Sequence, residues 1–289
     1  MATLLEIVTN VGQRAGYSVD TSVTTSVDQT TVQLRAMAND IIKRMSYAYE
    51  WPHLFRSGRI DFLTGVSTYA LPADLSEYHF DSFWNQSTKW RIFGPLSESD
   101  YASIQGYGLV AYPYGQFQLR GITDKEFYIY PTPSKNAVGV FEYMSARYVK
   151  PRTWAAGQTA TIGSYTFYNG NYYTAATAGT TGATPPTWTT GTQSDGGVSW
   201  TYYAGKYETF LADTDEPLIS SLVLEQGMLE TFASQHGIPC DISYDTDLDE
   251  AYQRRVPGQM LYAGGSYSGI LIQSRSGVVS FGKGFGPNW

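Results

Sequence analysis

The stretch TTVQLRAMANDIIKRMSYAYEWPHLFRSGRIDF, residues 30–62, decides the fold class because its hydrophobic period changes in the middle. Up to Tyr49 the apolar residues recur every three or four positions, which is the spacing of one helix face. After Trp51 and Pro52, Ile60 and Phe62 alternate with other residues, which is typical of a strand. Proline disfavours a helical residue before it, so we expect the helix to stop here. The stretch predicts a mixed α+β protein.

Helices are predicted from capping residues and helical spacing at 3–15, 28–49, 215–235 and 241–255. Thr3 and Asp28 are the expected N-caps of the first two. The third is expected to begin at Asp215-Glu216-Pro217, since acids and proline favour a first turn. The fourth has acids first and Arg254-Arg255 last, which suits the helix dipole. Residues 17–27 are polar and β-branched and predict a loop.

The β region is predicted over residues 54–150. Thr64-Gly65 is expected to turn a hairpin between a strand at Ile60 and Phe62 and a strand at Tyr69 and Leu71. Further strand-like runs lie at 78–84, 90–93, 116–119, 126–130 and 138–147. Ser97 and Asp100 resemble a capping box, which predicts a short helix that begins there and continues through Ile104. Short strands separated by glycine and proline predict a small antiparallel sheet or barrel.

Composition points away from catalysis and from membranes. The formal charge is −7, which argues against a nucleic-acid clamp with a basic face. Cys240 is the only cysteine, so no internal disulfide and no cysteine metal cage can form. His53, His79 and His236 have no metal-ligand spacing, and no phosphate-loop motif occurs. We therefore expect no enzyme, cofactor or metal, and the absence of an 18-residue apolar run predicts no membrane-spanning helix.

Two further segments differ in composition from their surroundings. Residues 154–203 contain ten aromatic residues and one charge, Asp195, among many Gly and Thr, which predicts an inserted all-β module over 151–205. Residues 256–289 have eight glycines, yet large apolar residues are spaced through them. This pattern predicts an extended C-terminal arm that becomes ordered on a partner. Its candidate docking residues are Leu261, Tyr262, Ile270, Ile272, Phe281, Phe285 and Trp289.

The order of the motifs resembles the head-to-tail adaptor proteins of short-tailed bacteriophages, also called tail tubular or head-completion proteins. The motifs are W-P-x-L at 51–54, Y-x-L-P-x-D at 69–74, EFYIYPTP at 126–133, FEYMSARY at 141–148 and DTDEPLI at 213–219. The resemblance covers 1–150 and 206–255, which together would form the adaptor domain, with a helical bundle part and a small antiparallel β-sheet or barrel.

The resemblance implies a non-enzymatic virion protein at the neck between capsid and tail, assembled in the host cytoplasm. It implies a homo-oligomeric ring of about twelve copies around a DNA channel. Its partners would be the portal protein on the helical side, and tail nozzle or tail fibre proteins on the β side. Viral DNA would pass through the channel without sequence-specific binding. Some members of the family extend a C-terminal arm along the portal, which would suit residues 256–289.

Residues 167–188, FYNGNYYTAATAGTTGATPPTW, resemble small chitin-binding-like carbohydrate modules. That resemblance implies exposed rings that stack on sugars, to be sought among Trp154, Tyr172, Tyr173, Trp188 and Trp200. The same rings could instead form the core of a small module or contact tail fibres or neighbouring adaptors. The alternative function is thus a carbohydrate- or receptor-binding surface protein acting through 154–203. A cell-wall hydrolase would need catalytic residues that the sequence does not display.

Overall fold

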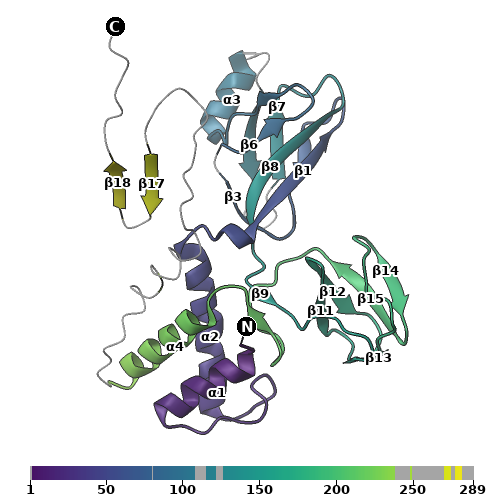
Figure 1. Cartoon of the computed structure of the whole chain (residues 1–289). Helices are drawn as coiled ribbons and strands as arrows, with labels where there is room; N and C mark the ends of the chain where they lie inside the picture. Colours follow the sequence, from purple (N-terminus) through teal and green to yellow (C-terminus); the bar gives the residue numbers. More distant parts are fainter. Residues whose placement is uncertain are drawn as a thin grey trace. The chain divides into compact units, whose positions relative to one another are not determined.

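The structure is a computed structural model that describes residues 2–79, 81–107, 115–121, 126–237, 248, 270–274 and 277–281. The chain divides into two compact units, whose helices and strands are labelled in Figure 1. The helical unit comprises Met1–Pro52, Tyr148–Lys150 and Glu208–Trp289. The β unit comprises His53–Arg147 and Pro151–Tyr207. The chain therefore passes from the helical unit to the β unit twice.

Capping residues define the first two helices of the helical unit. Helix α1 (Leu4–Ala15) begins with a capping box in which Thr3 and Glu6 bind each other's backbone amides. It ends at Gly16, whose φ of 81° is the left-handed conformation that glycine favours. Helix α2 (Gln29–Ala48) begins at Asp28, whose carboxylate accepts a hydrogen bond of 2.8 Å from the Thr31 amide. The helices predicted at 3–15 and 28–49 are confirmed to within about one residue.

Helices α1 and α2 pack with α4 (Ser221–Gln235), and Figure 1 shows the three in the helical unit. The apolar stripe of α2 is buried as its spacing predicts; it consists of Leu34, Met37, Ala38, Ile41, Ile42 and Met45. Trp51 closes the end of α2, because its indole Nε1 donates a 2.7 Å hydrogen bond to the Met45 carbonyl and its side chain is fully buried. A 3₁₀ turn, Pro52–Leu54, follows.

The prediction that the third helix begins at Asp215 is wrong, because α4 begins six residues later. The Asp215 carboxylate instead accepts hydrogen bonds from the Leu211 and Ala212 amides, 2.8 and 3.0 Å away, and stabilises a turn. The next two residues form β16 (Glu216–Pro217), which pairs antiparallel with β9 (Val149–Lys150). Glu216 and Pro217, which were expected in the first turn of the helix, form a strand instead because they pair with residues far away in the sequence. The predicted helix 241–255 lies outside the described residues, apart from Leu248.

Asp213 ties the loop before α2 to this turn and predicts a pH dependence. Its Oδ1 accepts hydrogen bonds from the Val23 and Thr24 amides, 3.1 and 2.8 Å away. Partial burial acts to raise the pKa of Asp213, but hydrogen bonds from Ser22, Thr24 and Val23 outweigh it and lower the pKa below 3.8. Because the folded-state pKa is depressed, this stabilisation is present above about pH 4 and is lost as the pH falls through the folded-state pKa.

We expect Asp213→Asn to destabilise the helical unit by about 1 kcal/mol at pH 7, a value reduced by solvent screening at this partly exposed position. Urea unfolding followed by helical circular dichroism should show this difference shrinking as the pH is lowered below 3.8, the ordinary pKa of the carboxyl group. Asp40→Asn, which removes only an exposed ion pair with Arg44, should change stability by less than about 0.5 kcal/mol at pH 7. A difference that stays constant down to low pH would contradict the role of the Asp213 charge.

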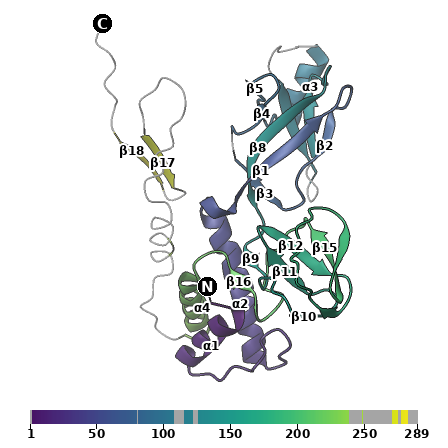
Figure 2. The ribbon, with the colours of Figure 1, turned by 45° about the vertical axis from the view of Figure 1, so that its right-hand side comes forward.

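The β unit contains two antiparallel sheets within residues 53–147 (Figure 2). The five-stranded sheet consists of β1 (Phe55–Phe62), β3 (Leu75–Tyr78), β4 (Trp84–Asn85), β5 (Trp90–Arg91) and β8 (Ala137–Ser145). The three-stranded sheet consists of β2 (Thr68–Ala70), β6 (Gln116–Arg120) and β7 (Glu126–Tyr130). Strand β8 is central, since it pairs with β1, β3 and β4. The described residues contain no closed barrel, so the α+β class is confirmed and the barrel alternative is not.

The hairpin predicted around Thr64-Gly65 is wrong in its pairing. Both strands exist, but β1 pairs with β8 and β2 pairs with β7, so the two belong to different sheets. The turn therefore carries the chain from one sheet to the other. The predicted run 78–84 also differs, because residues 79–83 connect β3 to β4. Sequence periodicity identifies a strand but not its partner, which is set by contacts far along the chain.

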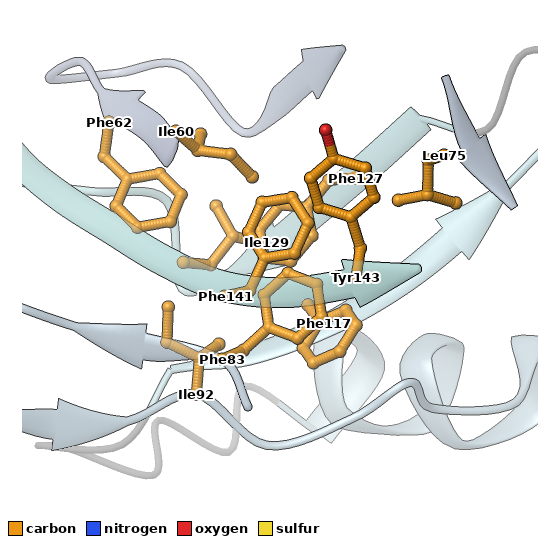
Figure 3. Close-up of a cluster of buried hydrophobic side chains, with 10 residues drawn as sticks. All are labelled: Ile60, Phe62, Leu75, Phe83, Ile92, Phe117, Phe127, Ile129, Phe141 and Tyr143. Carbon is orange, nitrogen blue, oxygen red and sulfur yellow. The ribbon is translucent and has the colours of Figure 1, made fainter. Parts of the chain in front are cut away.

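The core of the β unit fills the space between these strands with aromatic side chains (Figure 3). It consists of Ile60, Phe62, Leu75, Phe83, Ile92, Phe117, Phe127, Ile129, Phe141 and Tyr143. The Phe83 ring stacks on Phe141 at 4.5 Å and lies 4.4 Å from Phe117. Gly58 leaves room for the Phe141 ring, because an added Cβ would come within 2.3 Å of it. The short helix α3 (Glu98–Tyr107) is confirmed, with Ser97 accepting from the Asp100 amide.

Residues 151–207 form a separate four-stranded antiparallel sheet in the order β11-β12-β15-β14. The strands are β11 (Tyr165–Tyr168), β12 (Asn171–Ala175), β14 (Thr192–Asp195) and β15 (Val198–Tyr203), with β10 (Thr159–Ala160) and β13 (Gly179–Thr180) paired beside them. Figure 2 shows β11, β12 and β15 together. Near the C-terminus, β17 (Ile270–Ser274) pairs antiparallel with β18 (Gly277–Phe281).

Candidate interaction surfaces

The sheet of residues 151–207 has two faces of different character. One face carries Tyr173 beside Tyr202 and Ala175 beside Trp200; Tyr173, Ala175 and Trp200 belong to a small buried core, and the partly buried Tyr202 packs against it. The opposite face carries Tyr172 beside Tyr203 and Thr174 beside Thr201. Since side chains alternate between faces along a strand, each Tyr-Tyr pair in the sequence sends one ring to each side. The aromatic richness of the segment therefore serves two separate clusters.

Asp195, the only charge between Trp154 and Tyr203, is a buried hydrogen-bond acceptor. Its Oδ2 accepts from the indole Nε1 of Trp154 at 2.8 Å and from that of Trp200 at 3.3 Å. Its Oδ1 accepts from the Gly182 amide at 2.8 Å. The carboxylate thus joins strand β14 to two aromatic rings and to the 181–191 loop. Both carboxylate oxygens of Asp195 accept hydrogen bonds within the protein, and the side chain is buried away from any ligand at the surface.

The structure divides the five predicted ring contacts into two groups. Tyr172, Tyr173 and Trp200 are buried, with exposed fractions of 1%, 0% and 2%, so none offers a ring face to a glycan or protein. Burial also raises the pKa of the Tyr173 hydroxyl. Trp154 and Trp188 remain partly exposed. The three buried rings are needed because a segment of this size without a disulfide must form its own core.

Five further rings are partly exposed and were missed by the sequence analysis: Tyr165, Phe167, Tyr168, Tyr202 and Tyr203. Tyr168 and Tyr202 pack at the margin of the small core, beside Trp188. The Tyr168 ring lies 5.9 Å from that of Trp154 in an edge-on contact. Tyr202 is paired directly with Tyr173, so both side chains lie on the same face of the sheet. The sequence alone does not show this pairing. The partly exposed rings of this segment are thus Trp154, Trp188 and these five.

A second group of exposed rings lies on the five-stranded sheet. Trp84, Trp90 and Phe93 have exposed fractions of 47%, 41% and 40%. Trp84 lies opposite Arg91 in the β4-β5 ladder, and the Arg91 guanidinium stacks over the Phe93 ring at 5.0 Å. Arg91 also forms an ion pair with Asp81. Phe83 and Ile92, the neighbours of Trp84 and Phe93, point into the core, so Trp84 and Phe93 face outward.

A polar network, here called the Asp74 network, lies beneath the residues that lead into 151–207. Asp74 accepts hydrogen bonds from the Tyr143 hydroxyl at 3.0 Å and the Ser145 hydroxyl at 2.6 Å. Arg147 forms an ion pair with it at 3.3 Å. Burial, and then the charge and hydrogen bond of Asp74, raise the pKa of Tyr143 strongly. All four side chains are buried, so the network is structural.

The helical unit has a groove of about 390 Å³ between α2 and α4. It is lined by Ile41, Arg44, Gly227, Glu230, Thr231, Ser234 and Gln235. No metal-binding group of three or more His, Cys, Asp or Glu occurs among the described residues. In the same part of the chain, no helix has the length and apolar character needed to cross a membrane.

The candidate docking residues of the arm fall mostly outside the described residues. Leu261, Tyr262, Phe285 and Trp289 are not described. Ile270 and Ile272 lie in β17 and Phe281 in β18, with Ile270 opposite Phe281 in the ladder. No protein-family model matches the chain, and no curated protein matches it either.

Proposed function

We propose that the protein is a ring-forming head-to-tail adaptor that joins the portal to the tail and lines the DNA channel. The observation that carries this proposal is the spatial meeting of two motifs that define the resemblance. Asp74 of Y-x-L-P-x-D binds Tyr143, Ser145 and Arg147 of FEYMSARY, about seventy residues later. The two motifs are therefore joined in one buried network, which supports reading them as parts of a single fold.

The other motifs also lie at structural positions. Trp51 of W-P-x-L closes α2 through its bond to the Met45 carbonyl. Asp215 of DTDEPLI holds its turn, and its carbonyl accepts a 2.8 Å hydrogen bond from the Leu4 amide at the start of α1. The motif residues thus fix the helix ends and chain crossings of the helical unit. We propose that this unit is the helical bundle part of the adaptor and contacts the portal.

Exposed apolar side chains support an assembled state. In the helical unit Val27, Leu222 and Leu211 have exposed fractions of 96%, 58% and 53%. In the β unit Trp84 and Phe93 face outward beside Arg91, and Trp90 is exposed as well. Groups of exposed rings are commonly covered by a partner. Neighbouring copies in the ring, the portal and the tail nozzle or fibre proteins are the partners that we propose for these surfaces.

We further propose that 151–205 is an inserted module and that 256–289 is an arm docking on the portal. The alternative function, carbohydrate or receptor binding through 154–203, loses three of its five candidate rings to the core. A contact with tail proteins or neighbouring copies requires fewer exposed rings and is favoured. The arm would lose conformational entropy on docking, and the ring would offset this loss by presenting many arms together.

Deletion of residues 256–289 is expected to leave a folded protein that no longer binds the portal. Far-ultraviolet circular dichroism would check the fold, and co-sedimentation with the portal of the same virus would check binding. A full-length variant with Leu261, Ile270, Ile272 and Phe281 changed to serine should also fail to bind. Its matched control changes Gln259, Ser266, Ser268 and Ser280 to alanine and should bind normally. A truncated protein that still joins the portal would exclude the arm's role.

Ring formation tests the function itself. Negative-stain images of the purified chain, alone and mixed with portal, should show closed rings seated on the portal. Glycan binding by the full chain, without any rings or portal complexes, would favour the alternative function.

A further inference from the structure

The chain enters and leaves the 151–207 segment side by side. Strand β8 ends at Ser145, and the chain then continues through Ala146 and Arg147 toward the segment. On its return, the Tyr207 amide donates a 3.1 Å hydrogen bond to the Ala146 carbonyl, and Arg147 and Tyr207 form a parallel bridge. The chain before and after the segment therefore runs side by side at Arg147 and Tyr207, and Tyr148–Lys150 lie between Arg147 and the start of the segment. Whether the segment moves relative to the five-stranded sheet therefore depends on the contacts at this junction.

Arg147 makes contacts with both sides of this junction. Its guanidinium donates to the Tyr203 carbonyl from Nη2 at 3.1 Å and to the Gly205 carbonyl from Nε at 3.2 Å. It also stacks over the Tyr172 ring at 4.7 Å. On the other side, it pairs with Asp74, which is itself held by Tyr143 and Ser145 of β8. The Arg147 residue is only 6% exposed, so these contacts are largely shielded from water.

The geometry requires arginine rather than another cation. A guanidinium is planar and remains charged, so its plane can stack on a ring while its edge donates several hydrogen bonds. The Asp74 carboxylate compensates its buried charge. Lysine could supply the charge but not the combination of stacking and divergent donors.

We propose that Arg147 is a bracket that fixes the 151–207 segment in one orientation on the five-stranded sheet, so that the two form one rigid body. A partner pulling on the segment would then load β8, the central strand of that sheet. This inference is independent of the proposed function, because it concerns contacts within one chain. Its competitor is that the backbone contacts of Tyr207 with Ala146 and Arg147 hold the segment without the Arg147 side chain.

Spin-label distance measurements on the full chain test the bracket. In a Cys240→Ser background, labels at Lys135→Cys and Gln193→Cys report the separation of the five-stranded sheet and the segment, since both positions are exposed. The otherwise unchanged protein should give one narrow distance distribution. Arg147→Gln should broaden it by about twofold or more, because short two-strand connections without a fixed interface permit relative motion. Arg59→Gln, which removes an exposed arginine on the same sheet, should leave the distribution unchanged.

Two further outcomes keep the inference testable. If Arg147→Gln does not fold because Asp74 is left unpaired, the double variant Asp74→Asn with Arg147→Met removes both buried charges and should fold with the same broad distribution. If neither variant folds, Arg147→Lys decides: it keeps the positive charge beside Asp74 but not the stacking and divergent donors, so it should give the broad distribution, and a narrow one would overturn the proposal. A narrow distribution in either folded Arg147 variant would assign the orientation to the backbone contacts of Tyr207 and overturn the bracket.

Discussion

Asp195→Ala is expected to destabilise the 151–207 segment by about 3 kcal/mol, because three donors would lose one buried acceptor. The indoles of Trp154 and Trp200 and the Gly182 amide all bind this carboxylate. A buried donor left without a partner costs about 1–3 kcal/mol, and partial access of water to Trp154 reduces the sum. Urea unfolding followed by tryptophan fluorescence would measure the change. Hydrogen exchange at the Gly182 amide would localise it.

Two variants sharpen this test. Asp195→Asn keeps the size of the side chain and one acceptor oxygen, so we expect roughly half of the loss. Ser194→Ala lies on the exposed side of the same strand and should change stability by less than about 0.5 kcal/mol. Equal stability of Asp195→Ala and the unchanged protein would show that the carboxylate does not hold the segment together.

Phe83→Ala is expected to destabilise the β unit by about 4 kcal/mol, the usual cost of removing a buried ring. Phe83 is 3% exposed and its ring lies within 4.4–5.2 Å of the rings of Phe117, Phe127 and Phe141. The closely packed rings around it cannot readily collapse into the space, so a cavity remains. Thermal unfolding monitored by near-ultraviolet circular dichroism would measure the loss.

Leu63→Ala is the matched control for this substitution. Its side chain is 51% exposed in the turn after β1, so its loss should cost less than about 0.5 kcal/mol. If Phe83→Ala were no more destabilising than Leu63→Ala, the aromatic cluster in Figure 3 would not be the core that stabilises the sheets.

Sequence reasoning succeeded where a local signal was sufficient. The caps at Thr3, Gly16 and Asp28 fix α1 and α2 with interactions spanning only a few residues. The strand at 126–130 was located to the residue from its run of aromatic and β-branched residues. These elements follow from side chains acting on their own backbone, which is why the sequence is enough.

Sequence reasoning failed where the backbone of a segment pairs with a strand far away in the sequence instead of forming the local structure that its residues favour. Glu216 and Pro217 have the character of a helix start, but they pair with β9. The turn at Thr64-Gly65 suggests a hairpin, but β8 takes β1 as its partner through eight paired residues. Whether each of the five candidate rings is buried in the core or exposed for contact depends on which strand lies beside β12. The periodicity of the sequence does not encode that pairing.

The sequence by itself determined the α+β class, the extents of α1 and α2, and the strand character of most of the β region, because short-range capping and alternation set them. Only the tertiary structure decided that Asp74 meets Arg147, that Asp195 is a buried acceptor and that Tyr172, Tyr173 and Trp200 are core. The physical reason is that burial and hydrogen-bond partnership arise from pairs of segments far apart in the chain, and no single segment carries that information.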